Sequence, residues 1–130
     1  MHLRLGILIA AAGIPLAAHH SFEAEYDFNK TVKVTGVVSK MEWMNPHPHF
    51  YVDVKDTDGK VTHWNMELGA IPVLLKQGWR RDSLKPGDQV TVEGFLPKDG
   101  TKSMANARKV LLPDGRQVFG GSSAPVRDGQ

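Results

Sequence analysis

Short stretches of alternating apolar and polar residues dominate this chain. Turn sequences such as Asp58-Gly59 and Pro86-Gly87 separate them. Alternation places apolar side chains on one face of a strand, so the pattern indicates half-buried strands rather than helices. It predicts strands over residues 31–43, 49–55, 60–67, 89–96 and 103–112, with a short sixth over 116–119.

One helical segment interrupts this pattern, over residues 71–78. Pro72 suits its first turn and Gly78 its C-terminal cap. This order, in which three strands are followed by a short helix and then by further strands, is typical of the OB-fold. The OB-fold is a small, partly open Greek-key barrel. We therefore predict an all-β protein, an OB-fold-like barrel of five to six strands with one short helix between strands 3 and 4. An SH3-like barrel and a plain β-sandwich are the alternatives.

The N-terminus has the three parts of a secretory signal peptide. Arg4 supplies the basic part, residues 5–16 the apolar part, and Leu16-Ala17-Ala18 the small residues before a cleavage site. Cleavage after Ala18 fits better than cleavage after Ala17, and it leaves a mature chain that begins with His19. We therefore expect export to the periplasm. The apolar stretch is shorter than the ~20 residues of a membrane span, so we expect no span after signal removal.

The expected organisation has three parts. Residues 1–18 are the signal peptide, residues 19–119 an OB-like β-barrel domain with an N-terminal His-His arm, and residues 120–130 a disordered tail. Within the arm, Phe22 and Tyr26 are the expected anchors of an ordered segment or short helical turn.

Composition limits the classes of function. The chain has no cysteine, so no disulfide supports the core. It carries 16 Lys and Arg against 14 Asp and Glu, and Arg4 belongs to the signal, so the mature protein is close to neutral. Near neutrality argues against nucleic acid as a partner. The sequence also lacks a nucleophile elbow, a P-loop and a zinc-protease motif, so we expect a binding protein rather than an enzyme.

The grouping of the histidines indicates a metal site. His19 and His20 open the mature chain, and His47 and His49 flank Pro48 in a proline-stiffened loop. The α-amine and imidazole of His19 can chelate one ion, and neutral imidazole is the commonest side-chain ligand of Cu and Zn. We predict a metal site made of His19, His20, His47 and His49.

Copper is the favoured metal and zinc the less favoured one. The His19 amine, the His19 imidazole and His47 would give Cu(II) a T-shaped set of three nitrogens, with His20 or His49 as the fourth donor. Zn(II) would prefer a tetrahedral set of the four imidazoles.

Each of these residues also has a plainer interpretation. The terminal His-His can bind metal only incidentally, and His47 can donate to a carbonyl in an ordinary loop. His63 reads as a surface strand residue, and the methionines as core fillers. Glu67, at a strand end, can be a surface charge or a carboxylate that orients a histidine.

Several segments together resemble a known family. It is an uncharacterised family of small exported bacterial proteins, catalogued only as a domain of unknown function. The resemblance covers residues 18 to about 121 and implies an OB-like β-barrel in the periplasm, with no assigned reaction. It carries over to His19, His20 and His47 more strongly than to His49, where an apolar or aromatic residue is usual. The segments that carry it include Ala18–Phe22, Glu25–Asp27, Glu42–His47, Glu67–Gly69, Ser83–Asp88, Val92–Gly94 and Ala105–Arg108.

These observations lead to one expected function and two alternatives. We expect a periplasmic, non-enzymatic protein that binds copper or another transition metal through its histidine cluster, with the metal ion or a periplasmic protein as its partner. The first alternative is a metal-free OB-like module that binds a peptide, lipid or envelope partner. The second is a small copper-dependent oxidoreductase, since an N-terminal histidine also resembles the copper brace of lytic polysaccharide monooxygenases.

Overall fold

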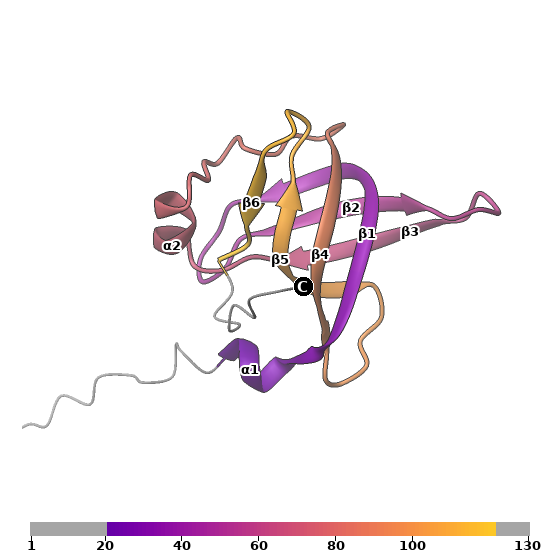
Figure 1. Ribbon diagram of the computed structural model, residues 1–130, viewed down its shortest axis with the longest axis horizontal. Coiled ribbons are helices and arrows are strands. Elements are labelled where there is room, and N and C mark those ends of the chain that lie inside the picture. The colour runs from indigo at the N-terminus through magenta and orange to yellow at the C-terminus, as the bar shows by residue number, and fades with distance from the viewer. Residues whose placement is uncertain (1–20, 122–130) are drawn as a thin grey trace, which may run out of the picture.

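The structure is a computed structural model, and it describes residues 21–121. The predicted signal peptide, His19, His20 and residues 122–130 lie outside the described residues. Six strands curl into a barrel with a short helix at each of two corners (Figure 1). In chain order the elements are α1 (Ser21–Glu25), β1 (Tyr26–Glu42), β2 (His49–Lys55), β3 (Val61–Glu67), α2 (Ile71–Lys76), β4 (Gln89–Pro97), β5 (Met104–Leu111) and β6 (Gln117–Phe119).

Strand pairing closes the barrel. The long strand β1 pairs antiparallel with both β2 and β4, and β2 pairs with β3. β5 pairs antiparallel with β4 and parallel with β3, through the register Glu67 opposite Asn106. The ring therefore runs β1-β2-β3-β5-β4, and α2 lies in the connection between β3 and β4. This confirms the predicted all-β, OB-fold-like barrel.

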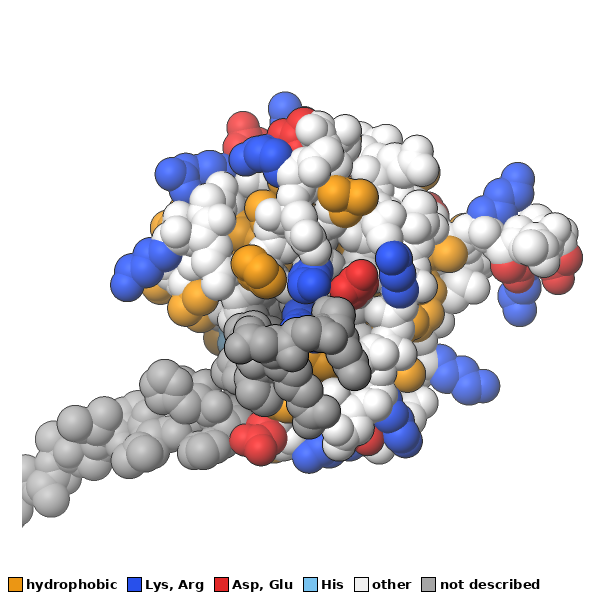
Figure 2. Space-filling model, in the orientation of Figure 1, with side chains coloured by type: hydrophobic (Ala, Val, Ile, Leu, Met, Phe, Trp, Pro, Cys, Tyr) orange, Lys and Arg blue, Asp and Glu red, His pale blue; other side chains and the backbone are white. Residues whose placement is uncertain are grey.

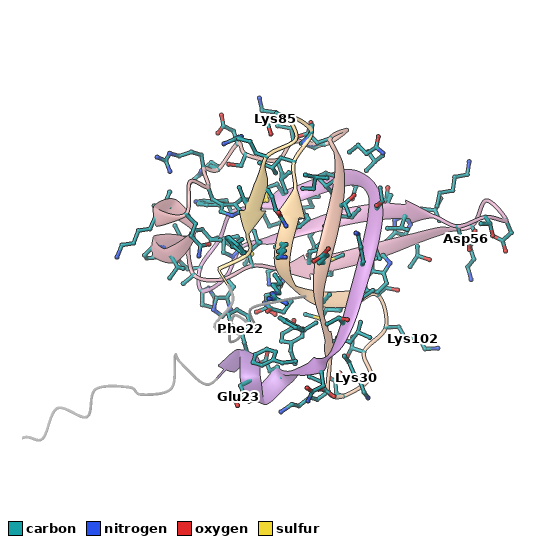
Figure 3. All side chains as sticks on the ribbon, in the orientation of Figure 1. Phe22, Glu23, Lys30, Asp56, Lys85 and Lys102 are labelled. Carbon is teal, nitrogen blue, oxygen red and sulfur yellow. The ribbon has the colours of Figure 1, made fainter. Side chains whose placement is uncertain are left out.

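Local sequence accounts for the element boundaries. Pro72 stands in the first turn of α2, and Gly78, at φ 95°, follows its end, as a helix C-terminus favours. The β2–β3 hairpin turns at Asp56–Gly59 and projects beyond the barrel, as Figure 3 shows at Asp56. β1 begins at Tyr26, five residues earlier than the alternation predicts, because an irregularity between Asp27 and Thr31 interrupts the period there.

Two apolar clusters hold the fold. The main cluster fills the barrel with inward residues such as Phe50, Val52 and Met66, and Trp79 joins it at 1% exposed. A second, smaller cluster joins α1 to the outside of the barrel through three buried aromatic residues, Phe22, Tyr26 and Phe95. The predicted anchors of the N-terminal arm are therefore confirmed, and the arm reaches the barrel through them.

The C-terminal end of the described chain is packed rather than free. The Gly120 N–H donates to the carbonyl of Arg108, and the Gly120 carbonyl accepts from the Gly69 N–H. A Cβ on Gly120 would lie 1.8 Å from the carbonyl oxygen of Ala107, so the approach of the two backbones needs glycine. Across residues 21–121, neither helix has the length and apolar character needed to cross a membrane.

Candidate functional site

The loop between β1 and β2 brings His47 to the end of β3. Pro48 is buried, and its carbonyl accepts a hydrogen bond from the Leu68 N–H at 2.9 Å. Leu68 directly follows Glu67, the last residue of β3. This backbone contact beside the loop tip therefore sets the imidazole of His47 over the carboxyl group of Glu67.

Glu67 is a buried carboxylate with two side-chain partners. Its exposed fraction is 7%, which is unusual for an acidic residue. The Tyr26 hydroxyl donates to Oε2 at 2.5 Å, and Nδ1 of His47 lies 2.9 Å from Oε1. An ionised carboxylate only accepts, so both contacts are charge-assisted hydrogen bonds and Nδ1 of His47 carries the proton. Of the two interpretations left open for Glu67, burial and the contact with His47 favour the carboxylate that orients a histidine over the surface charge.

Phe22 fixes the plane of the His47 ring. The two rings stack with centroids 4.6 Å apart and an interplanar angle of 28°. Figure 3 shows Phe22 on α1 turned toward the barrel, whereas Glu23 points away from it. Held at Nδ1 by Glu67 and on one face by Phe22, the imidazole has Nε2 as its remaining polar atom, and Nε2 makes no hydrogen bond to residues 21–121.

Tyr26, which begins β1 and donates to Glu67, has a raised pKa. Burial is the main cause that raises the pKa of the Tyr26 hydroxyl, and the hydrogen bond to the Glu67 carboxylate raises it further. The phenol therefore stays protonated and acts as a donor over the whole neutral range.

This shift predicts a loss of stability at alkaline pH. The folded state raises the pKa of Tyr26 above its unfolded value of about 10, so the stabilisation is complete below pH ~10 and decreases as the pH rises beyond it. We expect Tyr26→Phe to lose less unfolding free energy between pH 9 and 11 than the native chain does. Urea unfolding across that range measures it. Tyr51→Phe is the comparison, because burial and Glu42 also raise the pKa of Tyr51, but less than the pKa of Tyr26 is raised. Its effect should therefore be smaller, and an equal effect would contradict the assignment.

His49 lies next to this centre on the outer face of the sheet. It stands directly opposite Glu67 in the β2–β3 register, which places their side chains on the same face. Its Nδ1 lies 2.8 Å from Oδ1 of Asn65, an acceptor, so Nδ1 carries the proton, and Nε2 has no hydrogen-bond partner in the described part of the chain. Two of the predicted ligands, His47 in the loop and His49 at the start of β2, are therefore both anchored through Nδ1.

His63 belongs to a different place. It stands four residues before Glu67 along β3. Its Nδ1 contacts Oδ1 of Asp53 at 2.5 Å, and its side chain is 75% exposed. The interpretation of His63 as a surface strand residue is confirmed. Met66, fully buried in the main cluster, confirms the methionine prediction where it stands.

Two of the four predicted metal ligands, His47 and His49, are among the described residues. Among residues 21–121, no group of three or more His, Asp and Glu side chains comes together in a way that could hold a metal ion. The other two predicted ligands, His19 and His20, lie outside the described residues. A complete site would therefore have to draw donors from beyond the described chain.

Sequence reasoning missed Asn106 and the role of Tyr26. Asn106 is fully buried beside Glu67, and its Nδ2 donates to the Glu67 carbonyl at 3.2 Å. Tyr26 reaches Glu67 across 41 positions of sequence. The aromatic pattern marked Tyr26 as an anchor, but no local signal names its hydrogen-bond partner.

A search of solved structures gives a similar fold at low identity. The crystal structure of the mitochondrial single-stranded DNA-binding protein Rim1 from S. cerevisiae aligns with a TM-score of 0.48 and 13% identity, over 64% of this chain and 93% of that chain. No curated protein matches the sequence.

This comparison corrects one prediction. The exclusion of nucleic acid as a partner is withdrawn: the aligned structure is named as a single-stranded DNA-binding protein, and near-neutral net charge does not exclude such a partner. The physical reason is that net charge sums over the whole chain, whereas binding depends on the charge of one face. The binding of single-stranded DNA is stated for Rim1 and not for this chain.

The family search gives a definite result. A family model matches residues 7–106, which is most of the chain and includes His19, His20, His47 and Glu67. This agrees with the resemblance described from the sequence. The chain belongs to DUF6152, a family of unknown function.

Proposed function

We propose that this protein binds a transition metal ion, preferably copper, through Nε2 of His47. The observation that carries the proposal is the contact between Nδ1 of His47 and the buried carboxylate of Glu67 at 2.9 Å. Histidines that bind metals almost always donate their other ring N–H to a carboxylate, a carbonyl or water, which fixes the tautomer and makes the ligand more basic.

The cost of this arrangement supports a functional role. Burial of a carboxylate costs several kcal/mol, which partners must offset. Here Tyr26 and His47 supply those partners, and Phe22 covers the imidazole. A loop histidine without a ligand needs no such support, since a surface position would serve it as well.

The further donors in the proposal come from the start of the mature chain. Ser21 alone separates His20 from Phe22, whose ring stacks on His47. Consecutive Cα atoms are ~3.8 Å apart, so His20 and His19 are within covalent reach of the loop. With cleavage after Ala18, the amine and imidazole of His19 would join His47, and His20 or His49 would be the fourth donor.

Copper suits this donor set best. An amine and imidazoles favour Cu(II), which also has the highest affinity in the divalent series. The proposal keeps export to the periplasm and a binding role without catalysis.

Titration of the mature protein with Cu(II), in competition with a chelator of known affinity, tests the proposal. We expect one tight site in the protein that begins at His19, and a loss of affinity of roughly 100-fold or more in His47→Ala. His63→Ala is the matched control, because His63 is also anchored to a carboxylate but lies away from Glu67. Equal affinities of native protein and His47→Ala would contradict the proposal, and absence of tight binding would favour the metal-free interaction module.

A further inference from the structure

A hollow lies on the outer surface of β1, β4 and β5, away from the His47 loop. Its volume is about 270 Å³, just below the ~300–1,000 Å³ of pockets that hold drug-sized ligands, so it suits a small group. Figure 2 shows basic side chains on both sides of an acidic one across the surface over these strands. The lining residues are Thr31, Val32, Lys33, Glu93, Gly94, Phe95 and Arg108.

A break in the strand register aims Arg108 at this hollow. β5 pairs with β4 through Lys109 opposite Glu93 and Ala107 opposite Gly94, which leaves Arg108 as the extra residue of a β-bulge. A bulge turns a side chain away from the regular alternation, and bulges are frequent beside binding sites. The Arg108 guanidinium carbon lies 5.9 Å from the centroid of the buried Phe95 ring, so the ring supports it from one side.

The charges of the hollow do not balance. Lys33 and Glu93 form an exposed ion pair with 3.6 Å between Nζ and Oε1. Arg108 is half-buried, yet within the stretch from Ser21 to Gly121 its guanidinium makes no ion pair. The planar fork of an arginine matches the two oxygens of a carboxylate or phosphate group.

We propose that this hollow binds the anionic group of a small ligand, a carboxylate or a phosphate, with Arg108 as the two-pronged donor. Lys33 adds a second cation, and the hydroxyl of Thr31 stands at the edge of the hollow. The inference is independent of the metal proposal, because the two share no residue.

Two-dimensional ¹H–¹⁵N NMR of the mature chain tests the site, with inorganic phosphate and acetate titrated separately at constant ionic strength. We expect saturable shifts confined to residues 31–33, 93–95 and 108, and the stronger of the two ions identifies the anionic group. Arg108→Gln should weaken binding at least tenfold. Arg108→Lys, which keeps the charge and loses the fork, should weaken it less.

Lys109→Gln is the matched control, because it removes the same charge from the next residue of β5, which does not line the hollow. It should bind both ions as the native chain does. Shifts that do not saturate with either ion, or the same affinity in Arg108→Gln as in the native chain, would overturn the proposal.

Discussion

Glu67→Ala is expected to lower the free energy of unfolding by about 3 kcal/mol. The substitution leaves the Tyr26 hydroxyl and Nδ1 of His47 without their acceptor, and each buried polar group left unpaired costs ~1–3 kcal/mol. Urea unfolding at neutral pH measures the change. Glu93→Ala is the control, since its exposed ion pair with Lys33 should contribute less than ~1 kcal/mol. A Glu67→Ala protein as stable as the native one would show that the buried network contributes nothing.

The isosteric change Glu67→Gln separates the effect on stability from the effect on the site. The amide can still accept one hydrogen bond, but its NH₂ group only donates, so it would favour the His47 tautomer with the proton on Nε2. We expect a smaller loss of stability than in Glu67→Ala, together with a copper affinity reduced by roughly 10–100-fold.

Trp79→Ala is expected to cost about 3–5 kcal/mol, a loss of stability at least as large as that of Glu67→Ala. Trp79 is 1% exposed, packs near Phe50 with ring centroids 6.5 Å apart, and donates its indole N–H to the Phe119 carbonyl at 2.8 Å. The side chain therefore joins the segment after α2 to both the core and β6.

Trp79→Phe is the matched variant. It keeps a ring in the core and removes the indole N–H, so we expect it to lose about half as much stability as Trp79→Ala. The midpoint of urea unfolding gives both values. A loss below ~1 kcal/mol in Trp79→Ala would contradict the packing described for the barrel.

Local pattern was enough to predict most of the barrel. Alternation identified Phe50 and Val52 as inward residues, because a strand has a period of two whatever it pairs with. Pro72 and Gly78 marked α2 because their backbone preferences are properties of single residues. The parallel pairing of β3 with β5, which closes the ring, has no such signal, since it joins residues about 39 positions apart.

The candidate site was predictable only in its parts. The sequence indicated His47 as a ligand and Glu67 as a carboxylate that can orient a histidine, on residue type and position alone. It could not show that Tyr26, 41 positions away, shares that carboxylate, or that Phe22 stacks on the imidazole. Those contacts depend on how β1 and α1 pass over the end of β3, which is set by tertiary packing.

The bulge at Arg108 illustrates the same limit. The strand over residues 103–112 was predicted as regular, and one extra residue in the pairing changes where a side chain points. Composition counts Arg108 as one more surface charge, whereas the register places it in the lining of a hollow, where it forms no ion pair with residues 21–121.

The central claim is that His47 presents a free Nε2 to copper, and imidazole ¹H–¹⁵N correlation spectra of the mature protein test it most directly. The structure predicts a proton on Nδ1 of His47 and none on Nε2. Paramagnetic Cu(II), added below one equivalent, should then broaden the His47 ring signals first and leave those of His63 sharp. A proton on Nε2 of His47, or broadening that reaches His63 before His47, would contradict the account.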